Sequence, residues 1–269
     1  MKAEGLLGMT GRGFLAGLFV LAGLSAAPAT VPRESLEKAQ ALLAAGRPDE
    51  AVPSLEAAAA ARPKDPLALR LLAAAYAGVG DDRFEATYRR VFALVPNSLP
   101  FRLELVEALW QAGRGEAGNA EMDRLLREAG GPRLHLRYAI ELMRQDRFAD
   151  ATREFERGCR GGSCDAEALE AWGSALLETG RFRESAERYR LAIAREPGRV
   201  PARQKLGRVL LLVGDPAAAR RELSIAAERQ EDSPEILLDL GRALEALGQP
   251  EAAEDAYRRA IQLSRRQRP

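Results

Sequence analysis

Few side chains in this 269-residue sequence could perform imidazole, thiol or transition-metal chemistry. It contains one histidine, His135, and two cysteines, Cys159 and Cys164. A zinc site takes four ligands, or three and a water, mostly from His and Cys, so these residues could supply three at most. The phosphate-binding pattern GxxxxGK[ST], the metalloprotease pattern HExxH and the hydrolase pattern GxSxG are absent. We therefore expect no metal, no cofactor, no small-molecule substrate and no enzymatic activity.

The two cysteines are better placed for a disulfide than for catalysis. They stand five residues apart and flank Arg160-Gly161-Gly162-Ser163, and a turn with two glycines lets such residues approach to bonding distance. A redox enzyme would use C-x-x-C within a thioredoxin-like βαβ unit, and the sequence has neither. In an oxidising compartment we expect Cys159 and Cys164 to be bonded, with two free thiols as the alternative.

The first 29 residues have the pattern of a targeting segment. Lys2 and Arg12 precede an apolar run over residues 13–24, which is followed by small residues and Ala27-Pro28-Ala29. This order is typical of a secretory signal peptide, and we expect cleavage after Ala29. The alternative is an uncleaved N-terminal anchor in the inner membrane, which would also leave the rest of the chain outside the cytoplasm. Export and the arginine-rich composition together favour a bacterial periplasmic protein.

The charge balance excludes one class of partner. The sequence has 40 basic and 39 acidic residues, a formal net charge of +1, whereas a general nucleic-acid binder presents a strongly basic surface. We expect no nucleic-acid partner, and membrane contact only through an uncleaved N-terminal segment.

Beyond the targeting segment the sequence repeats itself. Gly173, Gly207 and Gly241 stand 34 residues apart, and each is followed seven residues later by another glycine. Each copy then has a large apolar residue and an alanine, at Tyr189 and Ala192, Leu223 and Ala226, and Tyr257 and Ala260. Apolar residues recur at spacings of three and four, which predicts helices with one buried face. Asp215-Pro216 is typical of a helix start.

This pattern resembles the tetratricopeptide repeat, a helix-turn-helix unit of about 34 residues. The last copy carries all of it, in Leu237, Leu240, Gly241, Leu244, Gly248, Ala253, Tyr257 and Ala260. Extended backwards, the register gives units starting at residues 32, 66, 99, 132, 166, 200 and 234. The resemblance implies an all-α, right-handed α-solenoid of about seven units over residues 30–267, with a polar tail at residues 264–269. It also implies that the second helix crosses close to the small residue of the first.

The resemblance further implies a concave groove that binds peptides or partner segments and is lined mostly by the first helices. The residues expected there are Leu103, Trp110, Leu136, Ile140, Met143, Arg144, Leu177, Arg208 and Leu211, with Glu107, Glu170, Glu178, Leu212 and Arg242 near them. Trp, Met and Arg often anchor interfaces, and Trp110 stands beside the core pattern. The alternative is that the leucines pack against neighbouring units and the charges are solvated.

Together these features predict a non-enzymatic scaffold or adaptor of the cell envelope that binds a protein or peptide in its groove. Two alternatives are a structural subunit of an envelope complex and a homo-oligomer. Both would dock through the last unit, because too few residues follow it to form a capping helix. The partner cannot be read from the sequence, since repeat surfaces vary while the core pattern persists.

Overall fold

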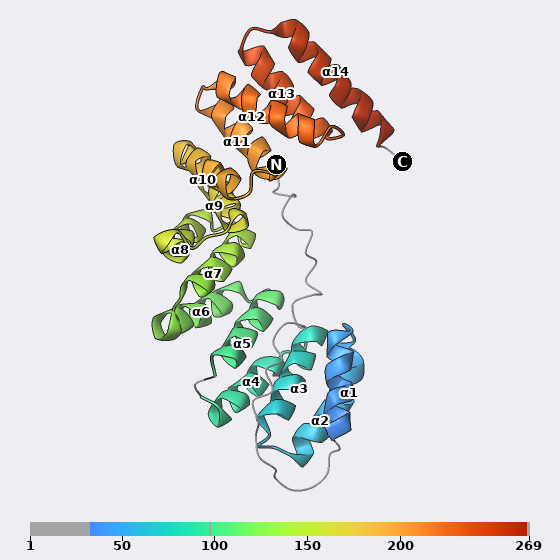
Figure 1. The fold of residues 1–269 in the computed structure, drawn as a ribbon. Coiled ribbons are helices and arrows are strands. Elements are labelled where there is room, and N and C mark those ends of the chain that lie inside the picture. The colour runs from blue at the N-terminus through green and yellow to red at the C-terminus, as the bar shows by residue number, and fades with distance from the viewer. Residues whose placement is uncertain (1–32, 97, 268–269) are drawn as a thin grey trace. The chain divides into compact units, whose positions relative to one another are not determined.

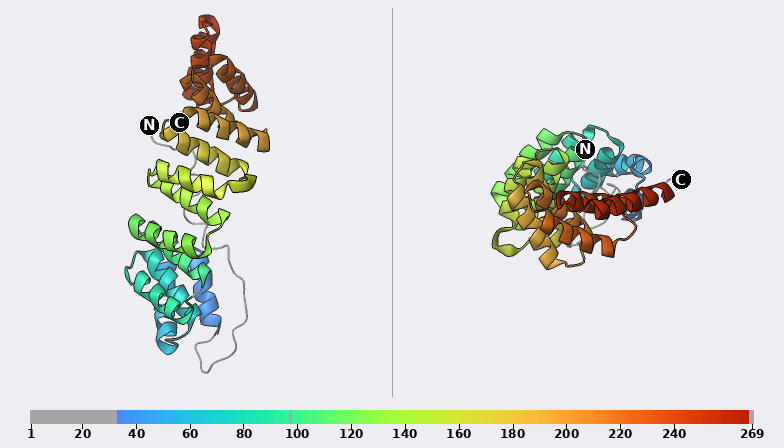
Figure 2. Two further views of the ribbon diagram at one scale, coloured as in Figure 1. Left: turned by 90° about the vertical axis from the view of Figure 1, so that its left-hand side faces the viewer. Right: turned by 90° about the horizontal axis from the view of Figure 1, so that it is seen from above.

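The computed structural model describes residues 33–96 and 98–267, which form α-helices and no β-strand (Figure 1). The expected signal segment, residues 1–29, lies outside the described residues. The chain divides into two compact units, residues 1–129 and 130–269. Each unit is built from helix pairs that follow one another along the chain (Figure 2).

In the first unit, each helix packs against the next one along the chain. The helices are α1 (Arg33–Ala44), α2 (Pro48–Ala61), α3 (Pro66–Val79), α4 (Arg83–Leu94), α5 (Leu99–Gln111) and α6 (Gly115–Ala129). Buried side chains of α1 to α5 form one core around Leu55, Leu69 and Tyr88.

The second unit has the same construction. Its helices are α7 (Pro132–Arg144), α8 (Phe148–Gly158), α9 (Ala166–Glu178), α10 (Phe182–Arg195), α11 (Val200–Leu212), α12 (Pro216–Arg229), α13 (Pro234–Ala246) and α14 (Pro250–Arg266). A short 3-10 turn, Arg160–Gly162, lies between α8 and α9. The predicted all-α fold of consecutive helix pairs is confirmed.

Acidic caps begin several of these helices. The side chains of Asp65, Asp165 and Asp215 accept hydrogen bonds from backbone N–H groups in the first turn of the following helix. These N–H groups have no partner within the helix, and the negative charge also complements the helix dipole. The helix start predicted at Asp215-Pro216 is confirmed.

The first helices are followed by residues in the left-handed backbone conformation. Gly214 follows α11 with φ of 80°, a conformation that costs glycine little. Asp146 holds the corresponding place after α7, with φ of 57°, because aspartate tolerates this region better than most residues.

The C-terminus differs from the expected polar tail at residues 264–269. Helix α14 continues through Arg266, so Ser264 and Arg265 belong to the helix. No glycine or proline interrupts this segment before Pro269. Arg265 and Arg266 also lie in the last turn, where positive charge complements the helix dipole.

In the pairs α9–α10 and α11–α12, the second helix packs directly on a glycine of the first helix, as the repeat pattern predicted. A Cβ atom on Gly207 would lie 2.5 Å from Cγ of Leu223, and one on Gly173 would lie 2.8 Å from the ring of Tyr189. Leu223 and Tyr189 are fully buried, with no exposed surface. Neither side chain can therefore move away without disturbing the core.

This packing predicts that Gly207→Ala destabilises the protein. In an unconstrained helix, alanine is favoured over glycine by about 1 kcal/mol. Here the added methyl group overpacks against Leu223 at a cost of about 1–3 kcal/mol, so we expect a net loss of up to about 2 kcal/mol in the free energy of unfolding. Urea denaturation followed by circular dichroism measures the change.

Gly131→Ala is the matched control. Gly131 precedes α7 in an extended conformation, and a Cβ atom there would meet nothing within 4 Å. We expect its stability to stay close to that of the unchanged protein. If Gly207→Ala were as stable as this control, the close approach would not constrain the fold.

Candidate functional site

Two carboxylates on first helices of the second unit are almost completely buried. The side chain of Glu170 on α9 is 2% exposed and that of Asp239 on α13 is 1% exposed. A buried charge is costly unless opposite charges and hydrogen bonds surround it. Each carboxylate therefore organises the side chains around it.

Asp239 is held by donors from two first helices. Nε of Arg208 donates to the carboxylate at 2.6 Å and Nε2 of Gln204 at 2.9 Å, both from α11. Nη1 of Arg242, three residues along α13, donates at 3.1 Å. We call Gln204, Arg208, Asp239 and Arg242 the Asp239 cluster. With one carboxylate and two guanidinium groups, it carries a net positive charge.

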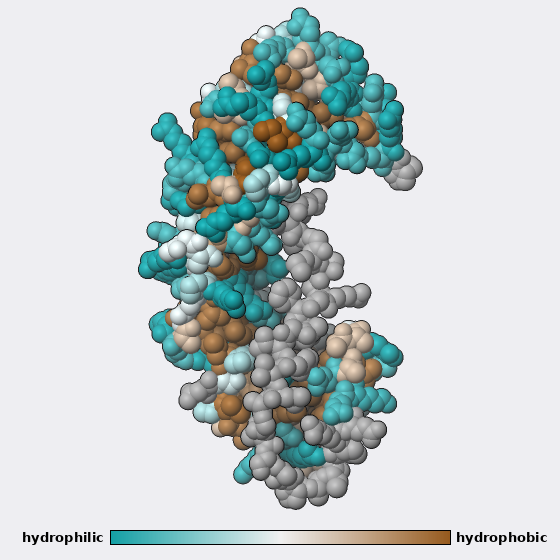
Figure 3. All heavy atoms as spheres, viewed as in Figure 1, coloured by the Kyte–Doolittle hydropathy of each residue, from teal (hydrophilic) through white to brown (hydrophobic). Residues whose placement is uncertain are grey.

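The two arginines of the cluster remain open to solvent. The side chain of Arg208 is 43% exposed and that of Arg242 is 63% exposed. Leu212 and Leu238 are exposed as well, and each lies four residues from one of these arginines on the same helix face. Figure 3 shows polar and apolar residues intermixed over this end of the second unit. The Asp239 cluster with these leucines, here the α11–α13 surface, can bind an anionic group beside an apolar one.

Glu170 links α9 to α11 in the same way. It accepts hydrogen bonds from Nε of Arg199 at 2.5 Å and from Nζ of Lys205 at 2.7 Å. Lys205 also donates to Oγ of Ser174. Burial lowers the pKa of Arg199, but the hydrogen bonds and negative charges of Glu170 and Glu196 together outweigh this effect, so the pKa is raised. Glu170 is thus paired with two basic side chains.

The first unit contains a related contact between its first helices. Arg70 of α3 donates to both carboxylate oxygens of Glu104 on α5, at 2.8 and 2.9 Å from Nε. The two residues are 34 positions apart, and the pairs Glu170–Lys205 and Gln204–Asp239 are 35 apart. First helices of successive pairs are therefore joined by polar contacts at one repeating position.

Two of the residues expected in the groove pack within their own helix pair. A Cβ atom on Gly118 would lie 2.5 Å from the indole of Trp110, and Nε1 of Trp110 donates to Oδ1 of Asn119 at 3.0 Å. Leu136 covers Gly158 of α8 in the same manner. Both side chains thus have an internal packing role.

The other residues expected in the groove differ in solvent exposure. Arg144 and Arg208 are exposed, whereas Leu103, Ile140, Met143, Leu177 and Leu211 are half-buried. Leu177 and Leu211 pack against the core around Tyr189 and Leu206. Leu103 and Trp110 belong to the first unit and the remaining seven to the second.

Gln204, Lys205 and Asp239 were not among the residues expected from the sequence. Their contacts follow spacings of 35 residues between polar side chains of opposite or complementary type. Complementary polar residues separated by about one repeat length could therefore have identified these contacts from the sequence. Glu170 and Arg242 were placed near the groove, but nothing in the sequence marked Glu170 as buried.

His135 has a structural role. Its Nδ1 lies 2.7 Å from Oε2 of Glu154, a buried residue of α8. Glu154 also pairs with Arg157. These contacts fasten α7 to α8.

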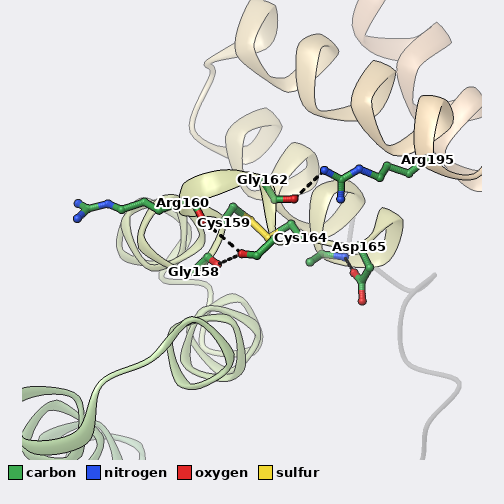
Figure 4. Close-up of a disulfide and its surroundings, with 9 residues drawn as sticks. Gly158, Cys159, Arg160, Gly162, Cys164, Asp165 and Arg195 are labelled. Carbon is green, nitrogen blue, oxygen red and sulfur yellow. Dashed lines mark hydrogen bonds between the residues drawn. A yellow bond between two sulfur atoms is a disulfide. The ribbon is translucent and has the colours of Figure 1, made fainter.

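The two cysteines are joined as a disulfide in the turn between α8 and α9 (Figure 4). Their Cα atoms are 5.0 Å apart. Arg195 of α10 donates to the carbonyl oxygen of Gly162 at 2.8 Å, and Oγ of Ser163 donates to the carbonyl oxygen of Gly158 at 3.1 Å. The turn that connects two helix pairs is thus fixed by covalent and hydrogen bonds.

Metal-binding clusters and membrane-spanning helices are two further features that a functional site could involve. Residues 33–96 and 98–267 contain no group of three or more His, Cys, Asp or Glu side chains arranged to hold a metal ion. Within the same ranges, no helix has the length and apolar character needed to span a membrane.

The Asp239 cluster predicts the effect of Asp239→Asn. The change removes the buried negative charge while the three donors remain, so we expect a loss of about 1.5–3 kcal/mol in the free energy of unfolding. Asp255→Asn is the matched control, because Asp255 is exposed on α14 and should matter little. Equal stability of the two variants in urea denaturation would contradict an organising role for Asp239.

Known proteins share both the repeat pattern and the fold. Tetratricopeptide repeat family models match residues 32–75 and 205–268. The C-terminal part of a TPR repeat-containing protein from Cytophaga hutchinsonii has a TM-score of 0.69 at 13% identity, covering 85% of this chain and 95% of that one. Two crystal structures of MamA have TM-scores of 0.59 and 0.57 at 17% identity.

The MamA matches cover 62% and 60% of this chain, and 91% and 95% of the MamA chains. At such identities the likeness is one of fold. No curated protein is similar enough in sequence to count as a relative. The family models thus identify tetratricopeptide repeats in residues 32–75 and 205–268, and the structural matches show that the consecutive helix pairs described above have the fold of tetratricopeptide repeat proteins.

Proposed function

We propose that this protein is a non-enzymatic scaffold of the bacterial cell envelope that binds a polypeptide segment of a partner protein on its α11–α13 surface. The observation that carries the proposal is the buried Asp239, which holds Arg208 and Arg242 while leaving both guanidinium groups open to solvent. Tetratricopeptide repeat proteins are generally scaffolds without enzymatic activity, which supports this class of function.

The arrangement favours an extended peptide with a carboxylate and an apolar side chain. A guanidinium group can bind a carboxylate through two parallel hydrogen bonds. Because Asp239 already holds Arg208 and Arg242, less side-chain freedom is lost on binding. Leu212 and Leu238 offer apolar contact next to the charged groups. Among the residues first expected in the groove, Arg208 fits this role best.

Two observations support an extracytoplasmic location. Residues 1–29 have the order of a signal peptide. The disulfide between Cys159 and Cys164 is a kind of bond that persists in oxidising compartments such as the periplasm. We place the protein in the periplasm, with an N-terminal inner-membrane anchor as the alternative.

A second candidate function is docking through the last helix pair, as a subunit of an envelope complex or a homo-oligomer. Ile261 on α14 is 50% exposed. Ile193, 68 positions earlier on α10, is packed against the core formed with the next helix pair. A further element packed on α14 would cover Ile261 in the same way.

Site-specific cross-linking separates the two candidates. With a photo-reactive amino acid in place of Leu238, we expect the exported protein to cross-link to one partner. Arg208→Glu with Arg242→Glu should abolish this product, because two attractive charges become repulsive. Arg183→Glu with Arg190→Glu, a change of equal charge at exposed residues of α10, should leave it intact.

Ile261→Asp provides the opposing test, since it adds a charge to the exposed face of α14. Loss of the partner only with Ile261→Asp would support docking through the last pair. Retention of the partner in the Arg208→Glu, Arg242→Glu variant would overturn binding on the α11–α13 surface.

The location predicts a defined mature N-terminus. Cleavage after Ala29 leaves Thr30 as the first residue, which an intact-mass measurement of the protein from a periplasmic extract would show. Full-length protein held in the inner membrane would support the anchor. A soluble cytoplasmic pool that retains residues 1–29 would contradict export.

A further inference from the structure

An open hollow lies between α12 and α13, apart from the residues of the α11–α13 surface. Its volume is about 450 Å³, and it is lined by Arg220, Arg221, Ser224 and Ile225 of α12 and by Leu240 and Leu244 of α13. Leu240 and Leu244 are one turn apart on a side of α13 different from that of Asp239 and Arg242.

The corresponding position between α10 and α11, one repeat earlier, is closed by apolar packing. Between α10 and α11, Ala186 and Leu206 are both 2% exposed and belong to the core. The residues 34 positions later are Arg220, which is exposed, and Leu240, which is only half-buried. An arginine side chain is long and charged, so it turns to solvent and does not cover the leucine as an alanine does. The hollow therefore results from a charged residue at a packing position.

The rim of the hollow carries positive charge without internal compensation. Arg220 and Arg221 are exposed, and neither forms an ion pair with another residue in the described part of the chain. They differ in this from Arg203 and Arg208, which pair with Glu222 and Asp239. Apolar side chains beside two unpaired guanidinium groups are complementary to an occupant that is both apolar and anionic.

The spacing of these apolar side chains favours a peptide. Leu240 and Leu244 are separated by about 6 Å along the helix axis, which is close to the spacing of alternate side chains in an extended chain. Leu191 on α10 is 46% exposed and stands 34 positions before Ile225, so apolar surface continues on the preceding second helix.

We propose that this hollow, built from Arg220, Arg221, Ile225, Leu240 and Leu244, is a second docking site for a partner protein. Its occupant is an extended segment in which Leu, Ile or Phe side chains alternate with Asp or Glu. The apolar side chains enter the hollow, and the carboxylates pair with Arg220 and Arg221. The site is independent of the Asp239 cluster and of the function proposed for it.

The test uses the full exported chain and a fluorescein-labelled peptide of twelve residues, Glu-Leu-Asp-Phe repeated three times. Fluorescence anisotropy measures its dissociation constant. Arg220→Ala with Arg221→Ala should weaken binding about tenfold, the sum expected for two exposed ion pairs. Arg265→Ala with Arg266→Ala, two adjacent exposed arginines of α14, should change binding less than about twofold. Unfolding curves of both variants check that each still folds.

Further arms separate this site from a purely ionic contact and from the α11–α13 surface. The same peptide with Ser in place of Leu and Phe should lose binding, since its carboxylates alone would not cover the apolar side chains. The peptide also has the carboxylates and apolar side chains that the α11–α13 surface is proposed to bind. Loss of binding with Arg208→Ala and Arg242→Ala, but not with Arg220→Ala and Arg221→Ala, would therefore assign the peptide to that surface and overturn the present proposal.

Several results would overturn the proposal. One is that the acidic-apolar peptide does not bind. Another is that the Arg220→Ala, Arg221→Ala variant binds it as tightly as the unchanged protein does. A third is that the serine peptide binds as tightly as the acidic-apolar peptide. Arginine-dependent binding to phosphatidylglycerol vesicles without binding of the peptide would instead assign the hollow to a lipid surface.

Discussion

The close approach of two helices over a residue with no side chain underlies each complete repeat of the second unit. Leu223 lies on Gly207 and Tyr189 lies on Gly173, with no space left for a Cβ atom. This contact brings the second helix onto the first and lets apolar side chains on both interlock. Each pair still buries too little apolar surface to be stable alone, so the next pair must pack against it. The succession of pairs follows from that requirement.

Because packing uses most of the large apolar residues, few of them are left for a partner. Trp110 and Leu136 show this, since each covers a glycine of the helix that follows it. First helices of successive pairs meet through polar side chains, with Glu170 between α9 and α11 and Asp239 between α11 and α13. A partner that approaches these helices meets arginines held by buried acids, with single leucines beside them.

Helix α13 takes part in both proposed surfaces. Its residues Asp239 and Arg242 face the donors of α11, while Leu240 and Leu244 face the hollow beside α12. A helix has 3.6 residues per turn, so neighbouring residues in the sequence project in different directions. A repeat near the end of the array can therefore offer two chemically different contacts, one formed around a buried carboxylate and the other around apolar side chains.

The sequence determined the parts of this structure that depend on local pattern. Spacings of three and four residues, the 34-residue period of Gly173, Gly207 and Gly241, and caps such as Asp215 specify helices, their ends and their pairing. These features depend on backbone geometry and on contacts within one unit, which recur at fixed separations. The proximity of Cys159 and Cys164 was also visible as a short separation across two glycines.

Only the tertiary structure decided which side chains are buried and which are available. Trp110 stands beside the repeat pattern, yet it packs on Gly118. In the sequence Asp239 resembles a solvated charge, but its side chain is 1% exposed. The hollow beside Arg220 likewise appears only when α12 and α13 are side by side. The physical reason is that burial depends on the neighbouring helix pair, whose side chains come from about 34 residues away. The sequence of one helix shows which residues share a face. The neighbouring helix pair decides which of those residues are covered.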